Sequence, residues 1–363
     1  MLTALLIAAL FSTQGPNKDL TMELRDPNTG ETSALALQRS ERLEDPKLSP
    51  KVFDGKKWEF DWLTAGYGLP VANGQMELRF RIYSQERKPG KDIALEVAAM
   101  DLRMWQLLNH KYKIDHADVD KGLRLVDEYL CWGGEAGGEQ TMGEDVEGGH
   151  VRRANTIYIY DIASFKDPME MAREVAHEYG HAVLPAVGGF RTPEDWANGY
   201  LGERLFLRWL RDASETGRID QGSTMGASFQ SLDKWVHTNV DPLVVDAASH
   251  APDKTILGGS GQKAMNAYMG LVLYADSVLP NQVVARSFKL TGSTSATDYP
   301  AALVEAASEG SFTLTIPNLL YGKKLWLPLG KSKVQGATVV VRKGAWAQVL
   351  PSSSSVIILA PGT

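Results

Sequence analysis

The sequence predicts an α+β protein in which a largely helical central region lies between two β-rich segments. Three observations support this class. Apolar and polar residues alternate through MELRFRIYS at 76–84, apolar residues recur at helical spacing from 92, and short apolar runs separated by Gly, Pro and Ser follow residue 285. With 363 residues, 44% of them hydrophobic and 23% charged, the chain is long enough to bury a substantial core.

The first residues predict export. The apolar run LTALLIAALF at 2–11 precedes the small and polar STQG, as in a secretory signal peptide, and it is too short to span a bilayer. We therefore expect a signal peptide over 1–15 and a secreted or periplasmic protein. No Lys or Arg precedes the run, so a buried N-terminal strand or helix is the alternative. Cys131 is the single cysteine, so no internal disulfide can form.

Charge and hydropathy narrow the classes of partner. The chain has 38 Lys and Arg against 44 Asp and Glu, which leaves a formal charge of −6 and no long basic run. That balance disfavours nucleic acid and anionic membranes. No later stretch is long and apolar enough to predict a transmembrane helix.

Residues 16–90 are expected to be β-rich, with turn signals at DPNTG (26–30) and KPGK (88–91). Residues 91–284 are expected to form a second region that begins with a helix over 92–113. Within it, four segments carry the remaining expectations: a strand or short helix at 122–130, a long Gly-rich and acidic surface loop at 132–149, a strand at 155–162, and a helix opening at DPMEMAREVAHEYGHAVL.

The start of that last helix is marked by three residues. Asp167 can accept from the first unpaired N–H groups, Pro168 suits the first helical position, and Glu170 completes a capping-box pattern. The helix is expected to end near Pro185. The segment HEYGH at 177–181 therefore lies well inside a helix that follows a strand.

HEYGH has the spacing of a zinc centre. Residues four apart share one helix face, so His177 and His181 can direct imidazole nitrogens at a single ion. Glu178 lies beside the first histidine, where it can act as general base towards a metal-activated water. The alternative is that three polar residues stand in this order by chance on a helix surface.

Zinc needs a third protein ligand. The metzincin pattern would require Gly at 184 and His at 187, but Leu184 and Val187 stand there. The helix predicted over 192–212 offers Glu203, which lies among apolar residues at helical spacing. We expect this carboxylate to be buried, a cost that metal coordination would offset. Glu194 is the competitor, in the first turn of the same helix, where acidic residues are common.

With these residues, the region over about 92–212 resembles the gluzincin-type metallopeptidases of the zincin superfamily. The resemblance implies a zincin-like catalytic domain, with the HExxH helix after an edge strand and a second helix carrying the last ligand. It implies that His177, His181 and Glu203 hold Zn²⁺ and that Glu178 is the general base. Gly202 precedes Glu203, where two subgroups of the family carry asparagine.

Residues 285–363 are expected to form a small all-β module, with strands within SFTLTIPN, KKLWLPL, ATVVVRK, AWAQVL and SVIILA. Four downstream residues are candidate oxyanion donors, and none is assigned: surface positions are expected for His237 and His250, and core positions for Tyr268 and Tyr274.

The sequence as a whole predicts an exported zinc-dependent metallopeptidase that hydrolyses peptide bonds in a peptide or protein substrate. Two alternatives remain. One is a zinc-binding surface protein without catalytic activity, and the other is a β-rich interaction module in which HExxH is accidental.

Overall fold

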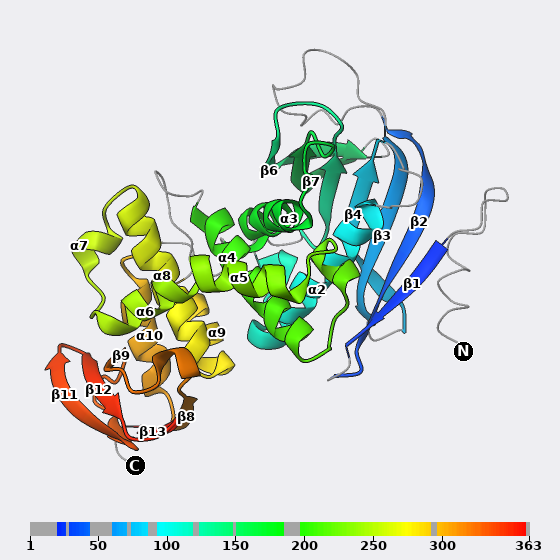
Figure 1. Cartoon of the computed structure of the whole chain (residues 1–363). Helices are drawn as coiled ribbons and strands as arrows, with labels where there is room; N and C mark the ends of the chain where they lie inside the picture. The colour runs from blue at the N-terminus through cyan, green and yellow to red at the C-terminus, as the bar shows by residue number, and fades with distance from the viewer. Residues whose placement is uncertain are drawn as a thin grey trace. The chain divides into compact units, whose positions relative to one another are not determined.

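The computed structural model of the chain describes residues 20–26, 29–43, 60–70, 74–85, 93–118, 123–147, 150–184, 197–291 and 296–360. The chain divides into two compact units, each built from separate segments (Figure 1). The first comprises Met1–Gln106, Asp120–Ala182 and Leu210–Phe229, and the second comprises Leu107–Val119, Val183–Trp209 and Gln230–Thr363. The predicted signal peptide at 1–15 lies outside the described residues, as does the turn at 88–91.

A seven-stranded sheet forms the first unit's framework. Its strands are β1 (Leu20–Arg25), β2 (Thr32–Leu43), β3 (Phe60–Pro70), β4 (Met76–Ser84), β5 (Val126–Leu130), β6 (Gly137–Glu147) and β7 (His150–Tyr160). Their order is β1-β2-β3-β4-β5-β7-β6. The β4–β5 and β5–β7 pairs are parallel, and the other pairs are antiparallel.

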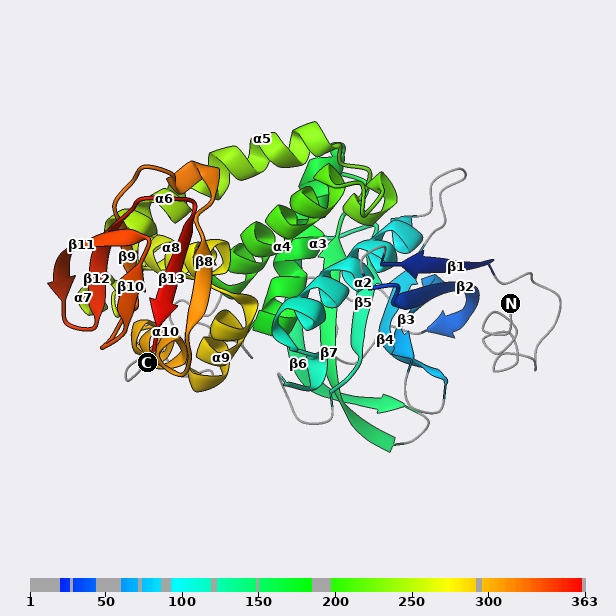
Figure 2. The same ribbon diagram turned by 90° about the horizontal axis from the view of Figure 1, so that it is seen from below.

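Two helices, α2 (Ile93–Tyr112) and α3 (Pro168–Val183), cover one face of this sheet (Figure 2). The Phe80 ring on β4 packs against Tyr179 of α3, with ring centroids 5.6 Å apart. Phe80 is paired with Gly66 on β3, and a Cβ on that glycine would touch Leu102 of α2 at 3.5 Å. Both helices therefore pack on the same side of the sheet, and α3 is held over its parallel centre.

An aromatic row fills the opposite face. Tyr83, Tyr129, Tyr158 and Tyr160 stack in sequence across β4, β5 and β7, with centroids 4.9, 5.2 and 6.0 Å apart. Phe60 meets Tyr129 edge-on at 5.0 Å. Because the central strands are buried on both faces, apolar residues occur on both sides of them.

The mixed α+β architecture with β-rich ends is confirmed. The strand predicted at 76–84 is β4, the helix predicted at 92–113 is α2, and the ambiguous segment at 122–130 is the strand β5. The strand expected at 155–162 is the second half of β7.

The prediction of a long surface loop at 132–149 is wrong. Most of this segment is β6, which pairs with β7 from Gly137↔Tyr160 to Glu147↔His150. Its glycines and acidic residues give no apolar alternation, because it is the last strand of the sheet and has little core to cover. The expectation that the strand before HEYGH is an edge strand is wrong for the same reason, since β7 lies between β5 and β6.

The second unit is helical at its centre. Its helices are the first part of α4 (Ala197–Glu215), then α5 (Phe229–Asn239), α6 (Asp241–Ser249), α7 (Lys254–Leu257), α8 (Gln262–Val278), α9 (Asn281–Thr291) and α10 (Tyr299–Ser308). Two three-stranded sheets follow, built from β8 (Phe312–Thr315), β9 (Leu325–Leu327), β10 (Lys333–Gln335), β11 (Ala337–Lys343), β12 (Trp346–Pro351) and β13 (Ser355–Leu359). They are ordered β10-β13-β8 and β11-β12-β9.

A buried ion network ties this unit together around Asp276 of α8. Its carboxylate accepts from the Trp209 indole N–H at 2.9 Å and pairs with Lys111 at 3.3 Å. It also bonds the Tyr112 hydroxyl and pairs with the Arg208 guanidinium. Every oxygen of this buried carboxylate is therefore matched by a donor.

The all-β expectation for 285–363 is wrong at its start, where residue 285 lies inside the helix α9 (Asn281–Thr291) and the helix α10 (Tyr299–Ser308) follows. Val283, Val284 and Phe288 recur at helical spacing and are buried, so the segment has an amphipathic helical pattern. From Phe312 onward the five expected strands are present, and β10 is an additional one.

None of the described helices combines the length and apolarity that would let it cross a bilayer.

Candidate metal centre

The α3 helix begins as its capping residues predict. The Oδ1 atom of Asp167 accepts from the Met169 N–H at 2.9 Å, and Pro168 occupies the first helical position. Along the helix, Ala172, Val175, Ala176 and Tyr179 are buried on the sheet side. That packing fixes which side of α3 turns away from the sheet.

A half-buried stripe runs along α3 through Glu174, His177 and His181. These residues are three and four positions apart, so they lie above one another on a single helix face. The two imidazole Nε2 atoms are 3.2 Å apart, and the ring planes meet at 72°. One ligand atom each from His177, Glu178 and His181 falls within 4.8 Å of the others, so this group could hold a metal ion.

Glu178 differs from the histidines in its burial. Only 3% of its surface is exposed, and its Oε2 atom has no hydrogen-bond partner among the residues that the structure describes. Burial raises the pKa of the Glu178 carboxyl well above its usual range, and the negative charges of Glu174, Glu128 and Glu139 raise it further. A cation at the histidines would oppose all of these effects.

The edge strand β6 packs directly on this carboxyl. A Cβ placed on Gly138 would lie 2.6 Å from both Cδ and Oε1 of Glu178, and closer still to its Cγ. Carbon atoms do not approach so closely, so a side chain at this position would displace Glu178 or β6. The neighbouring Gly137 has φ +145°, a backbone conformation that other residues rarely adopt. The glycines of this segment thus bring β6 against the site.

Asn155 links the three elements around the site. Its Oδ1 atom accepts from Gln140 of β6 at 2.8 Å, and its Nδ2 donates to the carbonyl of Ala182 in α3 at 3.0 Å. The side chain is almost fully buried. It therefore fixes the last turn of α3 relative to β6 and β7.

Two further carboxyls lie in the interior of this unit. Asp101 of α2 and Glu128 of β5 are 0% and 1% exposed. Burial raises the pKa of the Asp101 carboxyl to about 7, and burial together with the negative charge of Asp101 raises that of Glu128 well above its usual range. The pair therefore carries less than two negative charges at neutral pH.

Sequence reasoning identified His177, Glu178 and His181 but missed Gly138, Asn155 and the Asp101–Glu128 pair. A Gly-Gly dipeptide in an acidic stretch was the available signal for Gly138. Asn155 and the carboxyl pair left none, since single polar residues within apolar elements become informative only when their neighbours are known.

Glu203 lies on α4 in the second unit and is 2% exposed, so its predicted burial is confirmed. Its Oε2 atom accepts from Arg204 at 3.3 Å. The group of three does not include it. The competing Glu194 lies outside the described residues. The identity of the third ligand stays a prediction.

The four downstream candidates for an oxyanion donor have the surroundings expected of them. The side chains of His237 and His250 are 60% and 72% exposed and pair with neighbouring aspartates. Tyr268 and Tyr274 are buried, and the Tyr274 hydroxyl donates to the Trp326 carbonyl at 3.0 Å.

Comparison with models of protein families, with curated proteins and with solved structures finds no match to this chain. The case for a function therefore comes from the geometry and chemistry of the site.

Proposed function

We propose that the chain is an exported zinc-dependent peptidase, with its catalytic centre at His177, Glu178 and His181. The observation that carries the proposal is a pair of imidazoles with Nε2 atoms 3.2 Å apart, within 4.8 Å of a buried carboxyl whose Oε2 atom has no partner among the described residues. Such a carboxyl is costly unless a positive charge or a proton neutralises it. A divalent cation at the two histidines would offset that cost.

The donor set suits zinc. Imidazole nitrogen is a preferred zinc ligand, and a carboxylate commonly completes the set of three. We propose Glu203 for that place, because it is a buried carboxylate on the next helix of the chain. When bound, zinc supplies Lewis acidity and makes water a stronger acid.

Glu178 then acts as the proton carrier. It lies beside His177 in the sequence, is shielded from solvent, and has no described donor on its Oε2 atom. Next to a positive charge its carboxyl ionises at lower pH than burial alone would allow. An ionised Glu178 can take a proton from water and later give it to a leaving amine.

The sheet edge favours an extended peptide as substrate. Because β6 is the last strand, one side of its backbone pairs with no other described strand. An extended peptide can add to such an edge through main-chain hydrogen bonds, without a requirement for particular side chains. Gly138 on β6 packs against Glu178, so a strand added there would run beside the proposed base.

Zinc content is the first test. We expect about one zinc per purified wild-type chain and clear loss in His181→Ala and Glu203→Ala. Glu170→Gln is the matched control, since Glu170 is an exposed residue of the same helix. If Glu203→Ala retains zinc while His181→Ala loses it, Glu203 is not the third ligand, and Glu194 is the next residue to test. A wild-type chain that takes up no zinc would overturn the proposal.

A second candidate is a zinc-binding protein without catalytic activity. The observation that favours it concerns the four candidate oxyanion donors, since His237 and His250 are exposed and pair with aspartates while Tyr268 and Tyr274 are buried. Cleavage of a mixed peptide library separates the two. A zinc-loaded chain that cleaves nothing in the library would support the second candidate.

A further inference from the structure

The charge of the chain is distributed unevenly along the sequence. Residues 311–363 contain six Lys and Arg and no Asp or Glu, so this segment carries a formal charge of +6. The other 32 Lys and Arg stand against all 44 Asp and Glu, which leaves −12 for residues 1–310. The net charge of −6 therefore averages an acidic region with a wholly basic one, and it does not exclude an anionic partner for the basic region.

The basic segment is the C-terminal β module, which runs from β8 to β13 within the second unit. All six of its cationic side chains are exposed, and no ion pair joins any of them to a described carboxylate. An anionic partner would therefore meet positive charge that the described part of the chain leaves available. The six residues are Lys323, Lys324, Lys331, Lys333, Arg342 and Lys343.

Three of these residues gather at one end of the hairpin that β11 and β12 form. The Arg342 guanidinium, near the end of β11, donates to the carbonyls of Gly330 and Ser332 at 3.1 and 3.5 Å. Lys331 lies between these two acceptors in the sequence, and Lys333 follows them. The two bonds hold this short segment against Arg342, so three positive charges share one end of the hairpin.

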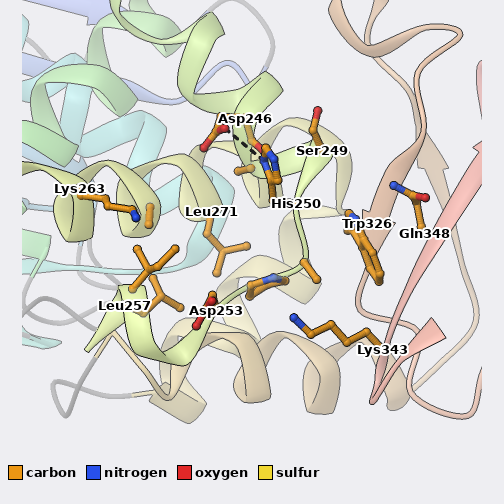
Figure 3. Close-up of a pocket in the computed structure, with 15 residues that line it drawn as sticks. Asp246, Ser249, His250, Asp253, Leu257, Lys263, Leu271, Trp326, Lys343 and Gln348 are labelled. Atoms are coloured by element: carbon orange, nitrogen blue, oxygen red, sulfur yellow. Dashed lines mark hydrogen bonds and ion pairs between the residues drawn. The ribbon is translucent and has the colours of Figure 1, made fainter. Parts of the chain in front are cut away.

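Lys343 has a different neighbour. Its side chain borders a pocket that also contains Asp253, and its ammonium end points towards that carboxyl (Figure 3). The Thr255 N–H and, to a smaller degree, the charge of Lys343 lower the pKa of the Asp253 carboxyl. The charge of Lys343 is therefore partly balanced within the second unit, and the other five residues make the basic surface.

Next to these charges, β11 exposes three consecutive valines. Val339, Val340 and Val341 are 37%, 45% and 47% exposed. Val339 pairs with Val349 and Val341 pairs with Gln348, which are successive residues of β12, so these two valines lie on opposite faces of the sheet. Val340 is the extra residue of a bulge between them. The strand therefore presents apolar side chains to solvent on both of its faces.

An exposed aromatic residue accompanies the remaining basic pair. Tyr321 is 62% exposed and comes shortly before Lys323 and Lys324, in the connection between β8 and β9. Tyrosine is enriched where a bilayer meets water, because its ring is apolar and its hydroxyl is polar. The module thus combines exposed apolar and cationic side chains in two places.

We propose that the C-terminal β module binds the surface of an anionic phospholipid bilayer. The valines of β11 enter the boundary between headgroups and acyl chains, and Lys331, Lys333 and Arg342 lie beside the lipid phosphates. Burial of apolar side chains and attraction of basic residues to anionic lipid both strengthen such binding. The inference concerns the second unit by itself and stands or falls separately from the zinc centre.

Two other partners fit this surface less well. Nucleic acid matches the positive charge, but it offers no apolar phase for the valines. A second copy of the chain could pair with β11, which is the edge strand of its sheet (Figure 1). The bulge at Val340 interrupts the regular row of backbone groups that such pairing needs, and two basic modules side by side would repel each other.

Sedimentation of the full chain with lipid vesicles tests the proposal. One set of vesicles is pure phosphatidylcholine, and in the other about a third of the lipid is the anionic phosphatidylglycerol. At physiological salt we expect the anionic vesicles to bind at least tenfold more tightly, because only they attract the basic residues. Added salt should reduce this preference, since it screens exposed charges.

A double substitution tests the charges. Lys331→Gln with Lys333→Gln should weaken binding to the anionic vesicles by about 25-fold, at roughly fivefold for each charge removed near the surface. Lys289→Gln is the matched control, since Lys289 is an exposed lysine on α9, outside the module. It should bind as wild type does.

A second double substitution tests insertion. Val340→Thr with Val341→Thr keeps the branched shape and the net charge but makes both side chains polar, so binding should weaken by about tenfold. Met22→Thr is the control, because Met22 is an exposed apolar residue of β1 in the first unit, 43% exposed. Its binding should be unchanged.

Four results would overturn the proposal. They are equal binding of wild type to both kinds of vesicle, tighter binding to double-stranded DNA than to anionic vesicles, unchanged binding in either double variant, and a vesicle-free dimer that the valine variant abolishes. The comparison of the two kinds of vesicle needs only the wild-type chain. The proposal therefore remains testable even if a variant fails to fold.

The apolar run at 2–11 is a separate route to a bilayer, and the same measurements distinguish it. It contains no charged residue. Binding through this run would not depend on the charge of the lipid and would persist in both double variants, so that outcome also overturns the proposal.

Discussion

Two buried carboxylates, one in each unit, have opposite surroundings. Asp276 in the second unit is bonded or paired by Lys111, Tyr112, Arg208 and Trp209. Glu178 in the first unit is equally buried, but its neighbours are acidic and its Oε2 atom has no described partner. The first arrangement stabilises the fold, and the second is the one expected of the functional carboxyl that we propose Glu178 to be.

The largest expected effect concerns Glu178→Gln. If Glu178 is the base, kcat/KM for peptide cleavage falls by about 10²–10⁴-fold while zinc content is unchanged. The raised pKa of Glu178 makes its ionisation unfavourable in the folded chain. With a chelator present for both proteins, the variant should therefore unfold at the same urea concentration as wild type or at a higher one. If Glu178→Gln were less stable than wild type but cleaved peptides normally, Glu178 would serve the fold, as Asp276 does, and not the reaction.

Asp276→Ala should show the opposite pattern. Removing this carboxylate leaves Arg208 buried without its charge partner, which costs about 3–5 kcal/mol of unfolding free energy. Asp246→Ala is the control in the same unit. Its side chain is 72% exposed, and loss of its contact with His250 should change stability by less than about 1 kcal/mol. Urea unfolding measures both, and equal effects would contradict the distinction.

Gly138→Ala tests how closely β6 is fitted to Glu178. The added Cβ would lie 2.6 Å from the carboxyl carbon, so the carboxyl must move. A displacement near 1 Å can lower turnover by about 10²-fold, and zinc content should be unchanged. In Gly310→Ala, where a Cβ meets nothing within 4 Å, activity should equal that of wild type. Full activity in Gly138→Ala would show that Glu178 has room to move.

The last effect is a gradual one, a change in the pH dependence of stability. The folded-state pKa of Asp101 is raised from 3.8 to about 7, so the folded chain binds more protons than the unfolded chain between these values. The contribution of Asp101 to the unfolding free energy of wild type therefore falls as pH rises through this window. Asp101→Asn should flatten that slope by up to about 1.4 kcal/mol per pH unit. Parallel profiles, measured by urea unfolding from pH 4 to 8, would show that Asp101 ionises normally.

The comparison also explains where sequence reasoning succeeded. The 76–84 strand, the 92–113 helix and the capped HEYGH helix each have a periodicity or a capping residue within a few positions. Such local signals act through backbone geometry, so they need no knowledge of the rest of the chain. Glu203 was predicted to be buried because its helical neighbours are apolar, and it is.

Where sequence reasoning failed over 132–149, the structure of the segment depends on its partners and not on an apolar pattern of its own. The strand β6 contains too few apolar residues to predict it, and it forms because β7 supplies its hydrogen bonds. The helices α9 and α10 were mistaken for part of an all-β module because the apolar strands that follow them dominate the pattern.

The sequence by itself determined the α+β class, the helix that carries His177, Glu178 and His181, and the placement of these residues on one side of that helix. Only the tertiary structure decided that Gly138 packs on Glu178, that Asn155 joins β6 to α3, and that Asp276 is fully paired. The physical reason is the distance along the chain over which the deciding interactions act. Helical spacing is set by bonds between residues four apart, whereas the burial of a charge depends on every element that surrounds it.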